Sequence, residues 1–227
     1  MLIRFDGRTA IVAGAARGIG QTIARSLAND GAHVIACDLL VDDLAPIAGR
    51  VEGGGEIIAA KVDVTNEASI AEVVHTAGGA DILVYVAGGV RGQRPRPLEE
   101  VSADDFDAIV DANLKGAFLF IKAVAPGMKK KGTGRIVTIS SRAGLATSLT
   151  GIQSYPAAKH GQIGLVKQLA QELGPFGITV NTVAPGFMAT SPDYEGQWNN
   201  WPAAFATISS TRLRCGAWAH RRTSPMR

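Results

Sequence analysis

Short apolar runs alternate with helical patterns along most of the chain. The apolar runs predict six strands, over residues 9–13, 33–37, 56–62, 82–86, 135–140 and 178–183. The segments between them predict five helices, over residues 19–29, 41–51, 67–76, 103–129 and 155–174. This alternation is typical of a parallel sheet covered by helices on both faces. It predicts an α/β fold, a single doubly wound parallel sheet of the Rossmann type, with ligands at the carboxyl ends of the strands.

The composition suits one domain of this class, since 46% of the 227 residues are hydrophobic. No apolar run approaches the roughly 20 residues of a membrane span, and no apolar signal stretch follows Met1. We therefore expect a cytoplasmic protein with no membrane partner. Cys37 and Cys215 lack the spacing of metal ligands, so we expect free thiols and no metal site.

The formal charge of +3 arises at the C-terminal end of the chain. Five arginines follow Thr211, and no acidic residue does. Removing these five from the 23 basic residues leaves 18 against 20 acidic ones, so the remainder is slightly acidic. A basic surface for nucleic acid is therefore not predicted, and we expect no nucleic-acid partner.

Three glycines, Gly14, Gly18 and Gly20, follow the first predicted strand and surround the start of a helix near Ile19. Backbone amides in such a turn can approach a pyrophosphate, and the helix N-terminus favours its negative charge. The turn therefore predicts a dinucleotide site. The alternative is that these glycines only make a tight turn.

Four polar residues further along form a candidate catalytic set: Asn113, Ser141, Tyr155 and Lys159. Tyr155 and Lys159 are four residues apart and share one helix face. An ammonium group near a phenol favours loss of the phenolic proton, so Tyr155 is a candidate acid and base. Ser141 follows a predicted strand, where its hydroxyl could hold a substrate oxygen, and Ser140 is the competing choice.

These residues, in this order, resemble the short-chain dehydrogenase/reductase family over residues 8 to about 190. The resemblance is carried by Gly14-x-x-x-Gly18-x-Gly20, Ala87-Gly88, Asn113, Ser141 and Tyr155-x-x-x-Lys159. The chain departs from the family pattern where Ala13 replaces a threonine and Tyr85-Val86 replaces two asparagines. The resemblance implies an oxidoreductase that interconverts a small secondary alcohol and a ketone by hydride transfer with a nicotinamide cofactor.

The resemblance also implies a role for each polar residue. Tyr155 would exchange the alcohol proton with the help of Lys159, and both would contact the cofactor. Ser141 would orient the substrate oxygen. Asn113 would hold an ordered water molecule that links Lys159 to solvent.

The predicted cofactor is NAD rather than NADP. Asp38 ends the second strand about 20 residues after the glycine turn, where a carboxylate can accept from the ribose hydroxyls and would repel a 2′-phosphate. Arg17 favours the opposite choice, because a basic residue in this loop often accompanies a 2′-phosphate in the family. Asp38 could instead cap the helix predicted from Val41.

The resemblance implies further cofactor contacts: Asp63 and Val64 at the adenine ring, Ala87 and Gly88 at the ribose, and Pro185, Gly186 and Thr190 at the nicotinamide. Asp63 and Thr65 could instead cap the helix from Asn66, and Pro185-Gly186 could be a plain turn. The missing asparagine amides at Tyr85-Val86 predict a less rigid strand end.

The end of the chain does not fit the family pattern. Residues 186–205 are rich in aromatic side chains and predict a mobile lid, whereas residues 211–227 show neither strand alternation nor an amphipathic helix. We predict a catalytic domain over residues 1–210, a disordered tail and a sheet without its last strand. Our hypothesis for the change is a reading-frame shift shortly before Arg214, in the natural gene or in its recorded sequence. An intact member would form a homo-oligomer, which this tail puts in doubt, and the alternative function is a damaged, inactive nucleotide-binding protein.

Overall fold

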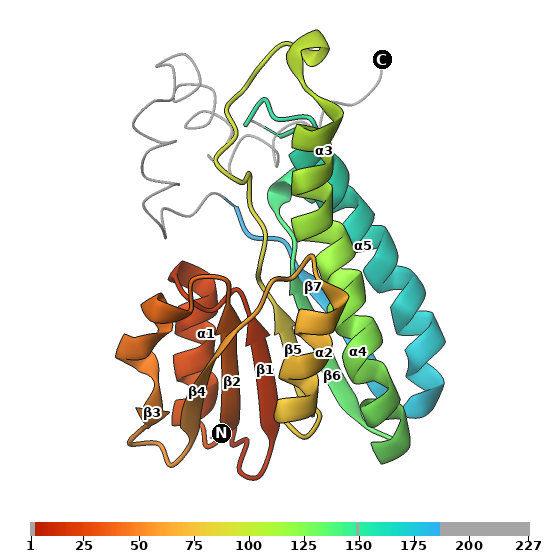
Figure 1. The fold of residues 1–227 in the computed structure, drawn as a ribbon. Coiled ribbons are helices and arrows are strands. Elements are labelled where there is room, and N and C mark those ends of the chain that lie inside the picture. The colour runs from red at the N-terminus through yellow and green to blue at the C-terminus, as the bar shows by residue number, and fades with distance from the viewer. Residues whose placement is uncertain (1–2, 149, 187–227) are drawn as a thin grey trace, which may run out of the picture. The chain divides into compact units, whose positions relative to one another are not determined.

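The computed structural model describes residues 3–148 and 150–186. Within them, seven strands form one sheet in the order β3-β4-β2-β1-β5-β6-β7 (Figure 1). Their bounds are β1 Thr9–Ala13, β2 His33–Asp38, β3 Gly49–Arg50, β4 Glu56–Lys61, β5 Ile82–Tyr85, β6 Gly134–Ile139 and β7 Ile178–Val183. Six strands pair in parallel, and they are the six that the apolar runs predict. Their order confirms the doubly wound fold.

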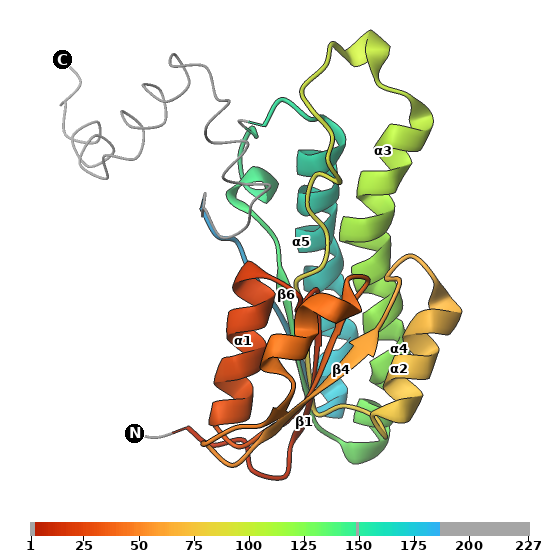
Figure 2. The ribbon, with the colours of Figure 1, turned by 60° about the vertical axis from the view of Figure 1, so that its left-hand side comes forward.

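Helices lie on both faces of the sheet (Figure 2). Their bounds are α1 Gly18–Asn29, α2 Glu67–Thr76, α3 Ala103–Val110, α4 Gly116–Lys131 and α5 Ser154–Leu173. Alternate residues of β1 enter two separate cores: Ala10 and Val12 pack with α1, whereas Ile11 and Ala13 pack with α2, α4 and α5. Among the described residues, no helix is both long and apolar enough to cross a membrane.

The helix predicted over residues 41–51 is wrong. Val41–Ile47 form a 3₁₀ helix, η1, which is followed by the short strand β3. Pro46 lies inside η1, and it has no N–H to donate to a continuing α-helix. The chain then turns back, and β3 pairs antiparallel with β4 at the sheet edge.

The helix predicted over residues 103–129 is present, but it contains an irregular turn. The chain forms α3, then a π-helical turn over Asp111–Lys115, called η3, and then α4. Such a turn inserts one extra residue into a helix, and it is frequent at functional sites. The candidate residue Asn113 lies at its centre.

The parallel register brings the carboxyl ends of the strands to one edge of the sheet. Ala13 lies opposite Cys37 on β2 and Tyr85 on β5, and Tyr85 lies opposite Thr138 on β6. The segments that follow these strands carry most of the candidate site residues, as the sequence predicts.

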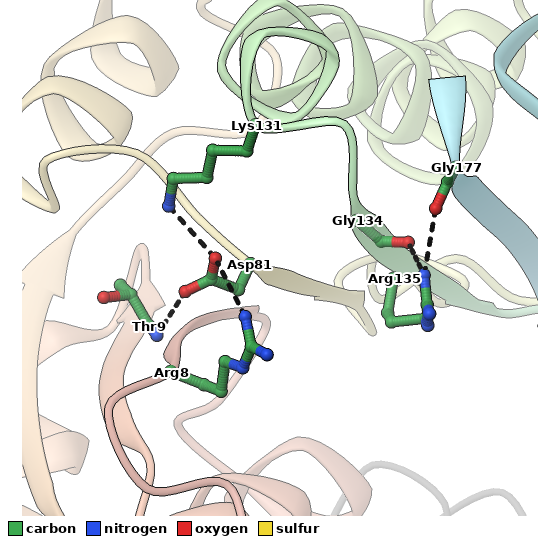
Figure 3. A network of polar contacts seen from close by, with 7 residues as sticks. All are labelled: Arg8, Thr9, Asp81, Lys131, Gly134, Arg135 and Gly177. Atoms are coloured by element: carbon green, nitrogen blue, oxygen red, sulfur yellow. Dashed lines mark hydrogen bonds and ion pairs between the residues drawn. The ribbon is translucent and has the colours of Figure 1, made fainter. Parts of the chain in front are cut away.

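The opposite edge of the sheet is fixed by a polar network (Figure 3). Asp81, just before β5, accepts from the Thr9 amide at 2.9 Å and from the Lys131 ammonium at 3.0 Å. Burial alone would raise the pKa of Asp81, but these contacts hold it below its usual value. Arg135 donates to the Gly177 carbonyl at 3.1 Å. The network joins the starts of β1, β5, β6 and β7 away from the candidate site.

Several predictions fall outside the described residues. They concern Thr190, Cys215, the lid beyond Gly186 and the tail over residues 211–227. The described residues therefore leave these predictions as they stand.

Candidate active site

The glycine turn after β1 requires glycine because backbone segments meet closely there. A Cβ on Gly14 would lie 2.4 Å from the Ala87 nitrogen, and one on Gly20 would lie 2.0 Å from the Gly14 oxygen. Neither contact is possible without a shift of the backbone. The Gly14 amide donates to the Cys37 carbonyl at 2.8 Å, which fixes the turn to the end of β2. The turn thus draws β1, β2 and the loop after β5 together.

Helix α1 begins inside this turn without a cap of its own. Arg17 occupies the N-cap position and makes no side-chain cap hydrogen bond, and the first turn carries no acidic residue. Gly18, Ile19 and Gly20 form that first turn. The first amides of an α-helix have no partner within the helix, so these groups can bind an anion.

Asp38 is held at the end of β2, beside the glycine turn. Its Oδ2 accepts from the Ala16 amide at 3.0 Å, and its Oδ1 accepts from the Leu40 amide at 3.1 Å. The carboxylate therefore braces the turn and keeps free lone pairs. The Arg17 guanidinium instead contacts Asp43, with Nε and Nη2 at 2.9 and 2.7 Å from Oδ2.

Asp63 and Val64 follow β4 at the same edge of the sheet. Asp63 is exposed, and its Oδ1 accepts from the Thr65 hydroxyl at 2.7 Å and from the Thr65 amide at 2.9 Å. These two bonds hold the pKa of Asp63 below its usual value. Asn66, not Asp63, caps α2 through the amides of Ala68 and Ser69. The capping alternative for Asp63 is thus wrong.

Asn113 fastens the loop that follows β5. Its Oδ1 accepts from the Gly89 amide at 2.9 Å, and its Nδ2 donates to the Gly89 carbonyl at 2.9 Å. The same Nδ2 donates to the Ile109 carbonyl at 2.8 Å. The side chain is fully buried and is committed to the backbone around Ala87-Gly88-Gly89. Both N–H groups of the Asn113 side chain are therefore used.

Tyr85 supplies a brace where asparagine is usual. Its ring is fully buried and packs against Phe120, with centroids 5.8 Å apart. Its hydroxyl donates to the Ala112 carbonyl at 2.6 Å, directly before Asn113. Val86 and Ala87 both donate backbone bonds to the Ala13 carbonyl. The Tyr85 phenol therefore supplies a hydrogen bond at this strand end in place of the missing amides.

The two candidate serines after β6 have different partners. The Ser140 hydroxyl is buried and donates to the Lys159 carbonyl at 3.1 Å. The Ser141 hydroxyl accepts from the Ala143 amide at 3.1 Å, so its own proton remains available. Next to it, the Arg142 amide donates to the Pro185 carbonyl at 2.8 Å. The segment Pro185-Gly186 therefore lies beside the Ser141 loop.

Tyr155 and Lys159 lie on one face of α5, both buried. The Tyr155 ring packs in a small apolar cluster with Val90, Ile109, Ala143 and Ile152. The Lys159 Nζ lies 5.8 Å from the centroid of that ring and donates to the Ile139 carbonyl at 2.8 Å. Burial lowers the pKa of Lys159 to about 7. A lysine that titrates near neutrality can take part in proton transfer.

Comparison with known proteins gives the family. Residues 8–200 match the family model described as short chain dehydrogenase. The chain belongs to this family. The members are NAD(P)-dependent dehydrogenases and reductases, so the chain is an oxidoreductase of that class.

Individual relatives of the short-chain dehydrogenase cover most of its length. It is 42% identical to the uncharacterized oxidoreductase YxjF of Bacillus subtilis, over 81% of this chain and 72% of the relative. It is 37% identical to a D-beta-hydroxybutyrate dehydrogenase of Rhizobium meliloti, over the same shares. The solved structure of a 7 alpha-hydroxysteroid dehydrogenase with NADH and a 7-oxo bile acid superposes with a TM-score of 0.77 at 31% identity, covering 91% of this chain and 80% of that one.

Three residues of this short-chain dehydrogenase site were missed by reasoning from the sequence. Asp43 pairs with Arg17, Tyr85 holds the backbone before Asn113, and Gln162 donates to the Asn113 carbonyl at 3.1 Å. A signal for Gln162 is present in the sequence, since it follows Tyr155 and Lys159 at the spacing of one helix face. The other two contacts depend on tertiary packing.

Proposed function

We propose that the chain is an NAD-dependent oxidoreductase that interconverts a secondary alcohol and a ketone, with Tyr155 as the acid and base. The observation that carries this proposal is the buried Lys159, fixed at the Ile139 carbonyl beside the Tyr155 ring. A positive charge at that point favours the phenolate over the phenol. Tyr155 then takes the alcohol proton at its phenolic oxygen, and donates it in the reverse reaction.

The glycine turn and the uncapped start of α1 suit the pyrophosphate of a dinucleotide. Amides without acceptors and a close backbone cradle are what that group needs. When bound, the nicotinamide supplies the chemistry of hydride transfer. Asp63 and Val64 would contact the adenine, and Ala87 and Gly88 the ribose. Pro185, Gly186 and Thr190 would contact the carboxamide.

NAD is favoured over NADP because of the partners of Asp38 and Arg17. Asp38 has a free carboxylate edge and two backbone donors that keep it in place. Arg17 is engaged by Asp43, which neutralises the cation that a 2′-phosphate would need. The carboxylate therefore faces the ribose with no competing positive charge from Arg17.

Ser141, not Ser140, is the group that orients the substrate oxygen. The Ser140 proton is already donated to the α5 backbone, whereas the Ser141 hydroxyl has a free proton. A hydrogen bond from Ser141 would hold the substrate oxygen for exchange of a proton with Tyr155.

The test is the Tyr155→Phe variant with NADH binding measured beside turnover. The substrate panel contains 3-hydroxybutyrate, a 7α-hydroxysteroid and simple secondary alcohols, with the matching ketones. We expect turnover to fall by about 10² or more while NADH affinity stays within a few fold, since only proton transfer is removed. Retained turnover in the variant would contradict the role of Tyr155. NADH binding by the wild type without turnover of any substrate would support the inactive nucleotide-binding alternative.

A further inference from the structure

Gln162 extends the Tyr155 and Lys159 face of α5 by one more turn. It follows Tyr155 by seven residues and Lys159 by three, so the three side chains leave the same side of the helix. Gln162 is fully buried, and α5 packs there against the π-helical turn η3. A fully buried glutamine needs partners for its amide, because buried polar groups are almost always hydrogen-bonded.

The orientation of the Gln162 amide is set by its partner. Nε2 donates to the Asn113 carbonyl at 3.1 Å, and the flipped amide would place two oxygens against each other. Oε1 therefore points the other way. It is buried and has no hydrogen-bond partner among the described residues. The site thus holds an acceptor that needs a donor.

The side chain that offers such a donor is Lys159. Its ammonium carries three N–H groups, of which one is used on the Ile139 carbonyl. Residues three apart on a helix are neighbours on its surface. Asn113 cannot serve as donor, because its side-chain amide is committed to Gly89 and Ile109.

We propose that Gln162 is a positioning residue for the Lys159 proton path: Nε2 holds the Asn113 carbonyl, and Oε1 accepts from Lys159 through one water molecule. This proposal rests on the proposed function, in which Lys159 assists Tyr155. An acceptor at the ammonium stabilises its charged form, which in turn favours the Tyr155 phenolate. Tyr155 and Lys159 are the titratable groups on this face of α5, and the two on η3, Asp111 and Lys115, pair with each other at 3.3 Å.

The first test compares Gln162→Leu and Gln162→Glu by the pH dependence of alcohol oxidation. Leucine removes the acceptor, so we expect the acidic limb of kcat/KM to move to higher pH by about 0.5 to 1 unit and turnover at neutral pH to fall several-fold. Glutamate can make both contacts only in its protonated form, with its O–H donating to the Asn113 carbonyl and its other oxygen as the acceptor, so this variant should keep the limb near its wild-type position. Gln168→Leu makes the same change on the exposed side of α5 and should leave the limb in place. A uniform loss of activity in Gln162→Leu with an unmoved limb would mean that Gln162 only supports packing, which overturns the proposal.

The second test needs no turnover. In ¹³C- and ¹⁵N-labelled protein, the side-chain amide signals of Gln162 are those that disappear in Gln162→Leu. We expect them to shift with pH through the titration of Lys159, and this shift to vanish in Lys159→Met. Signals that do not move with pH overturn the proposal even if the enzyme is active. If the Gln162 amide signals shift with pH but the protein turns over no substrate, the contact between Gln162 and Lys159 is supported. That result counts against the proposed function alone.

Discussion

Lys159 is buried as completely as an apolar core residue, although the role proposed for it needs a charge. Burial lowers the pKa of Lys159 to about 7, below the value of about 10.5 that it has in the unfolded chain. At a pH below the pKa of Lys159 in the folded protein, the lysine is charged in both the folded and the unfolded chain. The free-energy cost of burying that charge is then present in full. As pH rises from about 7 to about 10.5 the folded state is neutral first, and that cost disappears. Lys159 therefore lowers stability most at acidic and neutral pH.

The variant Lys159→Met should be more stable than the wild type by at least about 1 kcal/mol near pH 6, because methionine carries no charge to bury. The difference should shrink toward zero as pH approaches about 10. Urea unfolding of both proteins across this range measures it. A constant difference at every pH would show that Lys159 is not buried in its charged form.

Asp38 has two roles that substitution can separate. In Asp38→Asn the amide oxygen can still accept from Ala16, but the negative charge is gone. In Asp38→Ser the charge is also lost, and the shorter side chain no longer reaches the Ala16 amide. We expect both variants to admit NADP, and Asp38→Ser to lose more NAD affinity, by about tenfold, because its turn is also less well braced. Steady-state kinetics with both cofactors decides this, and a wild type that already prefers NADP would contradict the role given to Asp38.

At the scale of the elements, the sequence predicts the regular parts of the fold well and the irregular parts poorly. The bounds of β1, α2 and β7 match their predictions. In these elements the spacing of apolar residues shows which faces of the helix or strand are buried. Periodicity carries no signal for η3, since one extra residue in a long helix looks like ordinary helix. Pro46 does mark the failed helix after β2, but the pairing of β3 with β4 depends on distant residues.

The same distinction applies to the site. The Tyr155 and Lys159 pair follows from a four-residue spacing, so the sequence is enough to place both on one face. The bond from Tyr85 to the Ala112 carbonyl joins positions 27 residues apart, and no local pattern encodes it. From the sequence, Tyr85 is only the loss of an asparagine amide. In the structure, its hydroxyl holds the Ala112 carbonyl.

The contact between β5 and α4 is tight enough to measure by a double-mutant cycle. A Cβ on Gly116 would lie 2.3 Å from the Tyr85 hydroxyl oxygen and 2.9 Å from the Val64 carbonyl oxygen. We expect Gly116→Ala to cost about 1 to 3 kcal/mol, and Tyr85→Phe about 1 kcal/mol. In Tyr85→Phe the cost of Gly116→Ala should fall by about 1 kcal/mol, because the closest clash is gone. Additive costs in urea unfolding would exclude this steric coupling.

At the scale of the whole molecule, the two edges of the sheet have separate tasks. The candidate site lies at the carboxyl ends of the strands, and the Asp81 network joins their starts (Figure 3). Asp81→Asn keeps an acceptor for Thr9 but loses the charge that Lys131 contacts. We expect a loss of about 1 kcal/mol at neutral pH, which disappears as pH falls through the lowered pKa of Asp81 and the carboxylate is protonated in the wild type. NADH affinity, measured by fluorescence quenching, should not change, and a large change would show that the two edges are coupled.

The fit between Tyr85 and Gly116 also constrains the order in which this protein can accept mutations. While Tyr85 is present, any residue with a Cβ at position 116 lowers the stability of the fold, because that Cβ would lie too close to the Tyr85 hydroxyl oxygen. A lineage that replaces Tyr85 first opens position 116 to small side chains, although Val64 still limits their size. A lineage that begins at position 116 must pass through an unstable intermediate. Tyrosine at position 85 thus favours glycine at position 116 for as long as the tyrosine is kept.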